Sequence, residues 1–253
     1  MSVDREQIIT SLSEGLRQNP RVLAVWLEGA DATRNVDEYS DIDLCCSVEA
    51  GGLAEIPALA QAASERLGQR DLAHVLHDQA SFQHITYHLA GTSDYLLVDF
   101  CVYAAGRGSQ FVEGDEIERP LVLFDRGNVI QYRTPEEELA RHDNGGRLQE
   151  LRDTVAQYAR LDKVLKRGEF LEAFGYYHKW LLTPLIEALR MRYTPLHTDY
   201  YIVHISRHLP PAVRERMESL FQVNSVAEIE SKSREALRFF SRGERGSGFV
   251  GCV

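Results

Sequence analysis

The chain has 253 residues, with 38 acidic and 28 basic side chains and a formal net charge of −10 at pH 7. This length allows one large hydrophobic core or two smaller ones. The acidic balance argues against a general nucleic-acid binder, because such proteins present a basic surface to the phosphate backbone. No window approaches the ~18 apolar residues of a membrane span, and the N-terminus lacks the pattern of a signal peptide. We therefore expect a cytoplasmic protein with no membrane or nucleic-acid partner.

The first half of the chain mixes helical and strand patterns. Ile8, Leu12 and Leu16 recur at helical spacing, and a second helical stripe precedes Gly68. Helices are predicted over 4–18 and 53–67, strands over 21–28, 41–48, 72–76, 82–89, 95–103 and 121–124, and a loop over 104–115. This order predicts an α/β (α+β) domain over residues 1–134.

The second half is predicted to be helical. Thr134 is a suitable helix cap, Pro135 suits the first helical position, and acidic residues follow in the first turn. Asn144-Gly145-Gly146 is expected to end this short helix, and Pro184 predicts a kink near Leu182. Longer helices are predicted over 147–166, 169–193, 210–221 and 225–240. We expect an all-α bundle over 135–241 and a flexible tail over 242–253.

The stretch from Leu27 to Val48 carries the candidate chemistry. An apolar strand ends at Gly29, a polar loop is expected next, and Ser40-Asp41-Ile42-Asp43-Leu44 then begins a second strand. Alternate side chains of a strand share a face, so Asp41 and Asp43 should point the same way, with their Cα atoms about 6.5–7 Å apart. Two such carboxylates suit Mg²⁺, which prefers oxygen ligands. Without a metal they repel, and one tends to keep a proton.

Asp99 is the candidate for a third carboxylate. It lies in the middle of the most strand-like run of the chain, among aromatic and β-branched residues. A carboxylate in such a strand is costly to bury unless it is paired or binds a metal. The alternative is a structural aspartate that is bonded to a helix N-terminus or to an arginine.

Gly29-Ala30 and Ser40-Asp41-Ile42-Asp43-Leu44, with the loop between them, resemble the signature of the nucleotidyltransferase superfamily. The resemblance implies a nucleotidyltransferase-like domain with a mixed sheet, which binds Mg²⁺ and uses ATP as a substrate. The residues that match its catalytic metal ligands are Asp41, Asp43 and Asp99, and those that match its nucleotide contacts are Gly29, Ala30 and Ser40.

The chain departs from this signature at two positions. Ala30 stands where the family usually has a serine that touches the triphosphate, and Arg34 stands where many members have glycine. Asp31 also places a negative charge beside the expected phosphate site. These departures motivate an alternative, namely a degenerate or antitoxin-like module that has the fold but no turnover. A polymerase or RNA-tailing enzyme is a third reading, which the acidic composition disfavours.

The helical half, from Leu161 to Glu169 and through the aromatic-rich helix that follows, is similar to that of lincosamide and aminoglycoside nucleotidyltransferases. This resemblance implies an adenylyltransferase that moves AMP from ATP to a hydroxyl of a small molecule, such as an antibiotic, and releases pyrophosphate. It is also compatible with a homodimer. Glu113, Asp115 and Glu116 are candidate general bases from a loop, and no feature of the sequence selects one of them.

Basic and aromatic residues add further candidates. Arg152, Arg160, Lys163 and Arg167 fall on one helical stripe. We expect at least one to contact phosphate and choose Arg160 and Lys163; the alternative is a solvated helix face. His84 and His88 share a strand face and are interpreted as exposed polar residues rather than metal ligands. Most of the aromatic group Tyr176, Tyr177, His178 and Trp180 is expected to be core rather than a stacking wall for a substrate ring.

Overall fold

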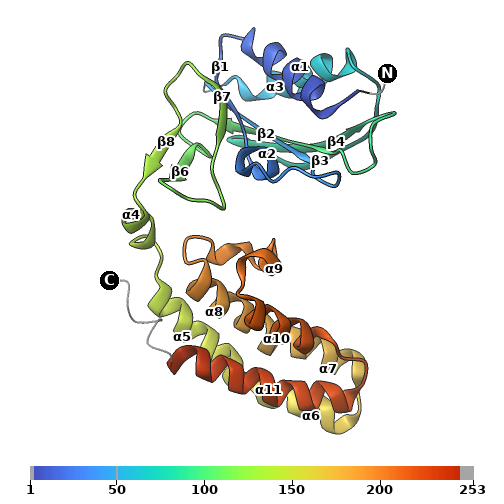
Figure 1. Ribbon diagram of the computed structural model, residues 1–253, viewed down its shortest axis with the longest axis vertical. Coiled ribbons are helices and arrows are strands. Elements are labelled where there is room, and N and C mark those ends of the chain that lie inside the picture. The colour runs from blue at the N-terminus through green and yellow to red at the C-terminus, as the bar shows by residue number, and fades with distance from the viewer. Residues whose placement is uncertain (1–2, 50, 246–253) are drawn as a thin grey trace. The chain divides into compact units, whose positions relative to one another are not determined.

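The computed structural model describes residues 3–49 and 51–245, and the chain divides into two compact units, 1–134 and 135–253. The helices of the first unit are α1 (Arg5–Arg17), α2 (Gly29–Thr33) and α3 (Ile56–Glu65). Its strands are β1 (Val22–Leu27), β2 (Ile42–Val48), β3 (Arg70–Gln79), β4 (Phe82–Leu89), β5 (Val98–Ala104), β6 (Gln110–Val112), β7 (Leu121–Asp125) and β8 (Gln131–Arg133) (Figure 1). Within the described ranges, no helix is both long and apolar enough to cross a membrane.

A six-stranded mixed sheet forms the centre of the first unit. Its strand order is β3-β4-β5-β2-β1-β7. The pair β2 and β5 is parallel, and the other neighbouring strands run antiparallel. This confirms the expected α/β class with a mixed sheet. Because β2 and β5 run in the same direction and in register, residues at their first positions lie side by side.

The two faces of the sheet are packed differently. Helices α1 and α3 cover one face, where Ile8, Leu12 and Leu16 pack with Leu44 and Phe100 in a buried cluster (Figure 1). The alternate side chains of the same strands point to the opposite face, where Trp26 and Cys45 pack with Phe111 of β6. Asp43 and Asp99 alternate with Leu44 and Phe100, so they belong to this opposite face.

Several predicted boundaries in the first unit were wrong. Strand β3 runs from Arg70 to Gln79 rather than over 72–76, and β5 starts at Val98 rather than at 95. The predicted loop over 104–115 contains β6, which pairs in parallel with β8. These two strands have three residues each, and such short runs show no clear alternation of apolar and polar residues.

The second unit consists of helices over its described residues. They are α4 (Pro135–Leu139), α5 (Asn144–Val155), α6 (Ala159–Arg167), α7 (Phe170–Tyr177), α8 (Thr183–Tyr193), α9 (Ile205–His208), α10 (Pro211–Phe221) and α11 (Val226–Arg245). A π-helical turn, His178–Leu182, joins α7 to α8, and the N–H of Thr183 donates to the carbonyl of His178. This turn precedes Pro184, which cannot donate a backbone hydrogen bond. The predicted irregularity near Leu182 is thereby confirmed.

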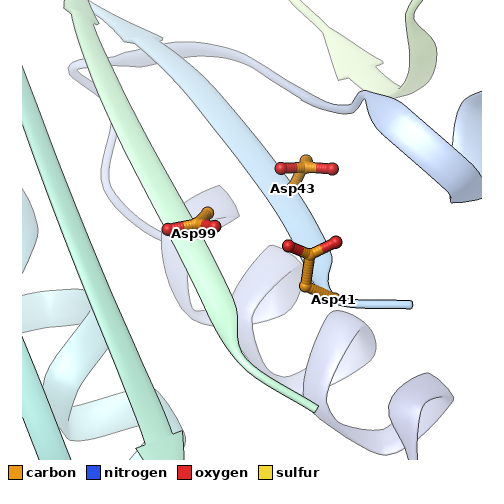
Figure 2. A group of neighbouring side chains, drawn as sticks. All are labelled: Asp41, Asp43 and Asp99. Atoms are coloured by element: carbon orange, nitrogen blue, oxygen red, sulfur yellow. The ribbon is translucent and has the colours of Figure 1, made fainter. Parts of the chain in front are cut away.

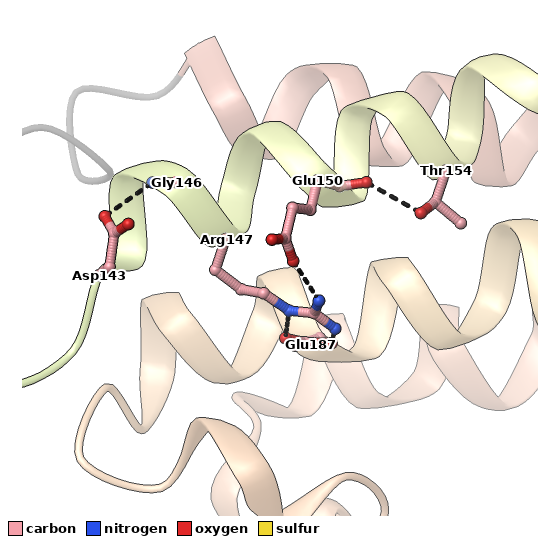
Figure 3. A network of polar contacts seen from close by, with 6 residues as sticks. All are labelled: Asp143, Gly146, Arg147, Glu150, Thr154 and Glu187. Carbon is pink, nitrogen blue, oxygen red and sulfur yellow. Dashed lines mark hydrogen bonds and ion pairs between the residues drawn. The ribbon is translucent and has the colours of Figure 1, made fainter.

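Three predictions in the second unit were wrong. Asn144-Gly145-Gly146 does not stop a helix but begins α5, where the Asp143 carboxylate accepts from the N–H of Gly146 at 2.9 Å (Figure 3). The single helix predicted over 147–166 is interrupted at Gln157, whose ψ is 16°. The tail predicted over 242–253 is helical to Arg245, and its remainder lies outside the described residues.

Helix α5 is tied to α8 by a charged network. Arg147 on α5 donates from its Nη2 to Glu187 Oε2 on α8 at 2.9 Å, and from its Nε to the other oxygen of the same carboxylate (Figure 3). Its Nη1 lies 2.5 Å from Glu150 Oε2. The fork of the guanidinium thus meets one carboxylate at two atoms, which is the strongest geometry for such a pair. These contacts raise the pKa of Arg147, with Glu187 as the main cause.

Candidate metal and nucleotide site

Three aspartates converge where β2 and β5 begin. Asp43 on β2 is the register partner of Asp99 on β5, and Asp41 directly precedes β2. The N–H of Ile42 donates to the carbonyl of Leu97 at 2.9 Å, which aligns the two strand starts. One carboxylate oxygen from each of Asp41, Asp43 and Asp99 lies within 4.8 Å of the others (Figure 2). The structure therefore brings together the three carboxylates that the sequence singled out.

The negative charges of Asp41 and Asp99 act on Asp43. The pKa of Asp43 is raised from 3.8 to about 7, first by burial and then by the negative charges of Asp41 and Asp99. Near neutral pH, Asp43 thus holds a proton for part of the time. A divalent cation among the three carboxylates would neutralise their repulsion, and oxygen donors are what Mg²⁺ requires. By donor type, spacing and charge, the cluster fits such an ion.

Gly29 lies directly against Asp43. Its φ is +57°, a region that side-chain-bearing residues rarely adopt, and a Cβ added there would lie 2.0 Å from Asp43 Oδ2. The preceding N–H, of Glu28, donates to the carbonyl of Asp43 at 3.0 Å. Only glycine therefore lets the chain turn this close to the carboxylate. The polar loop expected after Gly29 was wrong, because residues 29–33 form the short helix α2.

Ala30 lies in the first turn of this short helix, and Arg34 directly follows its end. The carbonyl of Ala30 accepts the N–H groups of Arg34 and, at 3.0 Å, of Asn35. Arg34 has a φ of +60°, and it stands where the resemblance leads one to expect glycine. The backbone thus keeps the left-handed conformation that glycine would favour, although the residue type has changed.

Ser40 helps to shape the loop that leads to the acids. Its hydroxyl donates to Asp37 Oδ1 at 2.8 Å and accepts the N–H of Asp37 at 2.9 Å. These bonds order the turn before Asp41. A nucleotide contact from Ser40 remains a prediction.

The unexpected charge of Asp31 has a partner. Arg5 Nη1 lies 2.5 Å from Asp31 Oδ2, and the same guanidinium donates to the carbonyl of Ser40. Their side chains are only 18% and 10% exposed. Burial nevertheless raises the pKa of Asp31, against the lowering effect of Arg5. Arg5 therefore offsets the negative charge beside the acid cluster and anchors the loop before Asp41.

Sequence reasoning missed Glu28 as part of this environment. Its carboxylate accepts a hydrogen bond from Trp26 Nε1 at 2.7 Å, and burial raises its pKa. It also adds to the negative potential at Asp43. The available signal was the alternation of Ala24 and Trp26 along β1, which continues to Glu28 directly after the strand and puts it on the same face as Asp43.

The prediction that His84 and His88 on β4 are exposed polar residues is wrong. His84 Nε2 lies 3.0 Å from Asp99 Oδ1, and its side chain is 22% exposed. His88 is buried, and its ring nitrogens contact Asp71 Oδ1 at 2.6 Å and the carbonyl of Ser93 at 3.0 Å. Across the described parts of the chain, the residues grouped closely enough to share a metal are the three aspartates, without either histidine.

The other candidate residues lie in the second unit. Arg160 and Lys163 are exposed on α6; Arg160 Nε donates to Gln157 Oε1 at 3.0 Å, and its guanidinium lies 5.6 Å from the ring centre of Trp180. Arg152 belongs to α5, so the helix break separates it from their stripe. Their phosphate contacts remain predictions.

Of the aromatic group in this unit, Tyr177 is buried, and its hydroxyl donates to the carbonyl of Leu220 at 2.9 Å. Tyr176 is 37% exposed, and His178 and Trp180 are half-buried. The expectation that most of these rings are core was therefore wrong, since only one of the four is fully buried.

No family model and no curated protein matches the chain. Among solved structures, it is similar to the GLD-2/RNP-8 complex at 10% identity and a TM-score of 0.32, covering 91% of this chain and 73% of that one. It is also similar to the Elizabethkingia meningoseptica CdnE cyclic dinucleotide synthase with GTP and Apcpp, at 11% identity and a TM-score of 0.32, covering 96% and 80%. The STING-associated CdnE c-di-GMP synthase from Capnocytophaga granulosa matches at 14% identity and a TM-score of 0.31, covering 96% and 84%. These likenesses are distant, and the functional argument rests on the three carboxylates themselves.

Proposed function

We propose that the first unit contains the active site of a Mg²⁺-dependent nucleotidyltransferase. The observation that carries this proposal is the convergence of Asp41, Asp43 and Asp99 where two parallel, adjacent strands begin. These three carboxylates would hold the metal. When bound, Mg²⁺ supplies charge neutralisation at the phosphates and lowers the pKa of an acceptor hydroxyl.

The reaction is the transfer of a nucleoside monophosphate. The acceptor oxygen forms a bond to the α-phosphorus, the bond between that phosphorus and the bridging oxygen to the β-phosphate breaks, and pyrophosphate leaves with the electron pair. The acceptor gives its proton to a base or to solvent. Gly29 serves this chemistry through its missing side chain, which leaves the Asp43 carboxylate room to face Asp41 and Asp99.

The substrates follow from the resemblance in the sequence. We propose ATP as the donor, with Gly29, Ala30 and Ser40 near its phosphates. Arg160 and Lys163 are retained as candidates for a phosphate contact, on the type of their side chains. The proposed acceptor is a hydroxyl-bearing small molecule. Aminoglycosides and lincosamides are the first compounds to screen, and the net charge of −10 is compatible with a cationic acceptor.

The proposal is tested by calorimetry of ATP binding with and without Mg²⁺. The proteins compared are the wild type, Asp41→Asn and Asp43→Asn. We expect Mg²⁺-dependent binding by the wild type and a loss of roughly 100-fold or more in each variant, since each removes a charged ligand of the metal. Asp78→Asn is the matched control, because Asp78 lies on the exposed strand β3 and bonds only Gln83 among the described residues.

Three outcomes discriminate between the candidate functions. Wild-type affinity in both site variants, or ATP binding that ignores Mg²⁺, contradicts the proposal. Metal-dependent binding without pyrophosphate release for any acceptor supports the degenerate module instead. Pyrophosphate release that depends on Asp41 and Asp43 supports the enzyme and identifies its acceptor.

A further inference from the structure

Asp99 is held from its other side by two polar side chains of β4. Thr86, its register partner on β4, donates its hydroxyl to Asp99 Oδ1. His84 Nε2 lies 3.0 Å from the same oxygen. Asp99 therefore sits between Asp43, its register partner on β2, and a pair of polar groups on β4.

Both contacts use the same carboxylate oxygen. Within the described residues, the hydrogen bonds to the Asp99 side chain all fall on Oδ1. The second oxygen, Oδ2, accepts none of these bonds, so it is available to a ligand. Two bonds on one oxygen also fix the rotation of the carboxylate about its Cβ–Cγ bond, which a strand position alone does not fix.

The ring of His84 is itself held in place. Its centroid lies 6.2 Å from that of His77, at an interplanar angle of 27°, and 6.3 Å from that of Phe82. His77 is the register partner of His84 on β3. Because the imidazole packs beside both of these rings, its Nε2 is presented to Asp99 in a defined direction.

We propose that Thr86 and His84 are positioning residues of the metal site, which orient Asp99 so that one of its oxygens joins those of Asp41 and Asp43. This inference rests on the proposed function and extends it to two residues of β4 that contact Asp99. Polar partners of ligating carboxylates commonly matter in this way, and their loss typically weakens metal binding by about 10- to 100-fold.

The test is Mn²⁺ affinity, measured on the full-length protein by the paramagnetic resonance signal of free Mn²⁺. Thr86→Val keeps the shape of the side chain and removes the hydroxyl. His84→Phe keeps a ring beside His77 and Phe82 and removes the nitrogen. We expect each to weaken Mn²⁺ binding by about tenfold or more, and the conservative variants Thr86→Ser and His84→Gln to recover most of that loss.

Two controls separate positioning from a merely structural role. The unfolding midpoint of each variant is measured without metal, because a structural role would lower this midpoint and leave the affinity of the folded protein unchanged. Thr154→Val repeats the same chemical change on α5, where the Thr154 hydroxyl donates to the carbonyl of Glu150 at 2.8 Å (Figure 3). This control should leave Mn²⁺ affinity unchanged.

The outcomes distinguish this inference from the proposed function. If the wild type binds Mn²⁺ through Asp41 and Asp43, and Thr86→Val and His84→Phe bind it equally well, the positioning role is overturned and the metal site stands. If the wild type binds no Mn²⁺, both proposals fail. Should Thr86→Val not fold, the comparison of His84→Phe with His84→Gln decides.

Discussion

Gly29→Ala is the sharpest test of how the site is built. The substitution places a methyl group 2.0 Å from Asp43 Oδ2 and 3.1 Å from its Cγ. It also forces a residue with a side chain to adopt a φ of +57°, which costs roughly 1–2 kcal/mol. The clash can be relieved in two ways. Either the backbone shifts, or the Asp43 carboxylate rotates away from Asp41 and Asp99.

The two ways of relieving the clash lower the free energy of unfolding by different amounts. A shift of packed backbone costs about 1–3 kcal/mol beyond the φ cost, so the free energy of unfolding would fall by about 2–5 kcal/mol. For a chain of this size that corresponds to roughly 4–20 °C in the unfolding midpoint. Rotation of the carboxylate costs less stability but removes a metal ligand. We therefore expect a large loss of Mn²⁺ affinity in either case, with a variable loss of stability.

Gly91→Ala is the matched control for this prediction. Gly91 also has a positive φ, of +84°, and an added Cβ would meet no atom within 4 Å. It therefore carries the backbone strain without the collision. Thermal unfolding and Mn²⁺ binding are measured on both variants. Equal midpoints together with wild-type Mn²⁺ affinity in Gly29→Ala would show that the close approach to Asp43 has no consequence, and the reasoning would be wrong.

Two further predictions follow from the charges around the cluster. The pKa of Asp43 is raised from 3.8 to about 7, so between about pH 4 and pH 7 the unfolded chain loses a proton that the native state keeps, and the stability of the metal-free protein falls as pH rises. Asp43→Asn removes this loss of stability, which is at most about 4 kcal/mol. Measured in chelator, the unfolding midpoint of the variant minus that of the wild type should therefore increase from pH 4 to pH 8. A difference that does not change with pH would contradict the raised pKa of Asp43. Arg5→Met leaves the largely buried Asp31 unpaired and should cost about 1–3 kcal/mol. Chemical denaturation should show that Asp31→Asn recovers much of this loss in the double variant, and strictly additive effects would argue against the ion pair.

The elements that the sequence predicted well are those with a long, regular pattern. Helix α1 was expected from Ile8, Leu12 and Leu16, and all three side chains are fully buried. Asp4 caps this helix, since its carboxylate accepts from the N–H of Gln7 and the Gln7 side chain accepts from the N–H of Asp4. The acids were found for a related reason, because the alternation of a strand fixes which side chains share a face.

Two features were misread in the sequence, one of them local and the other dependent on a distant strand. Asn144-Gly145-Gly146 has the composition of a stop signal, but Asp143 caps this segment and turns it into a helix start. His84 reads as a polar residue on a strand face, and only the pairing of β4 with β5 reveals that it contacts Asp99. The Asp143 cap was readable from the sequence, because aspartate is a preferred helix N-cap. Local propensity does not specify strand order, so the contact of His84 with Asp99 could not be derived from spacing alone.

The parallel pairing of β2 with β5 explains why the site costs stability and why it fits a cation. In register, this pairing sets Asp43 beside Asp99 and brings Asp41 close to both. Burial and the two neighbouring charges then work against ionisation of Asp43. A purely structural strand pair would be more stable with an apolar residue at one of these positions. The unfavourable arrangement has a simple physical rationale if a divalent cation binds among the carboxylates, because the same repulsion that weakens the metal-free protein then contributes to the affinity for the ion.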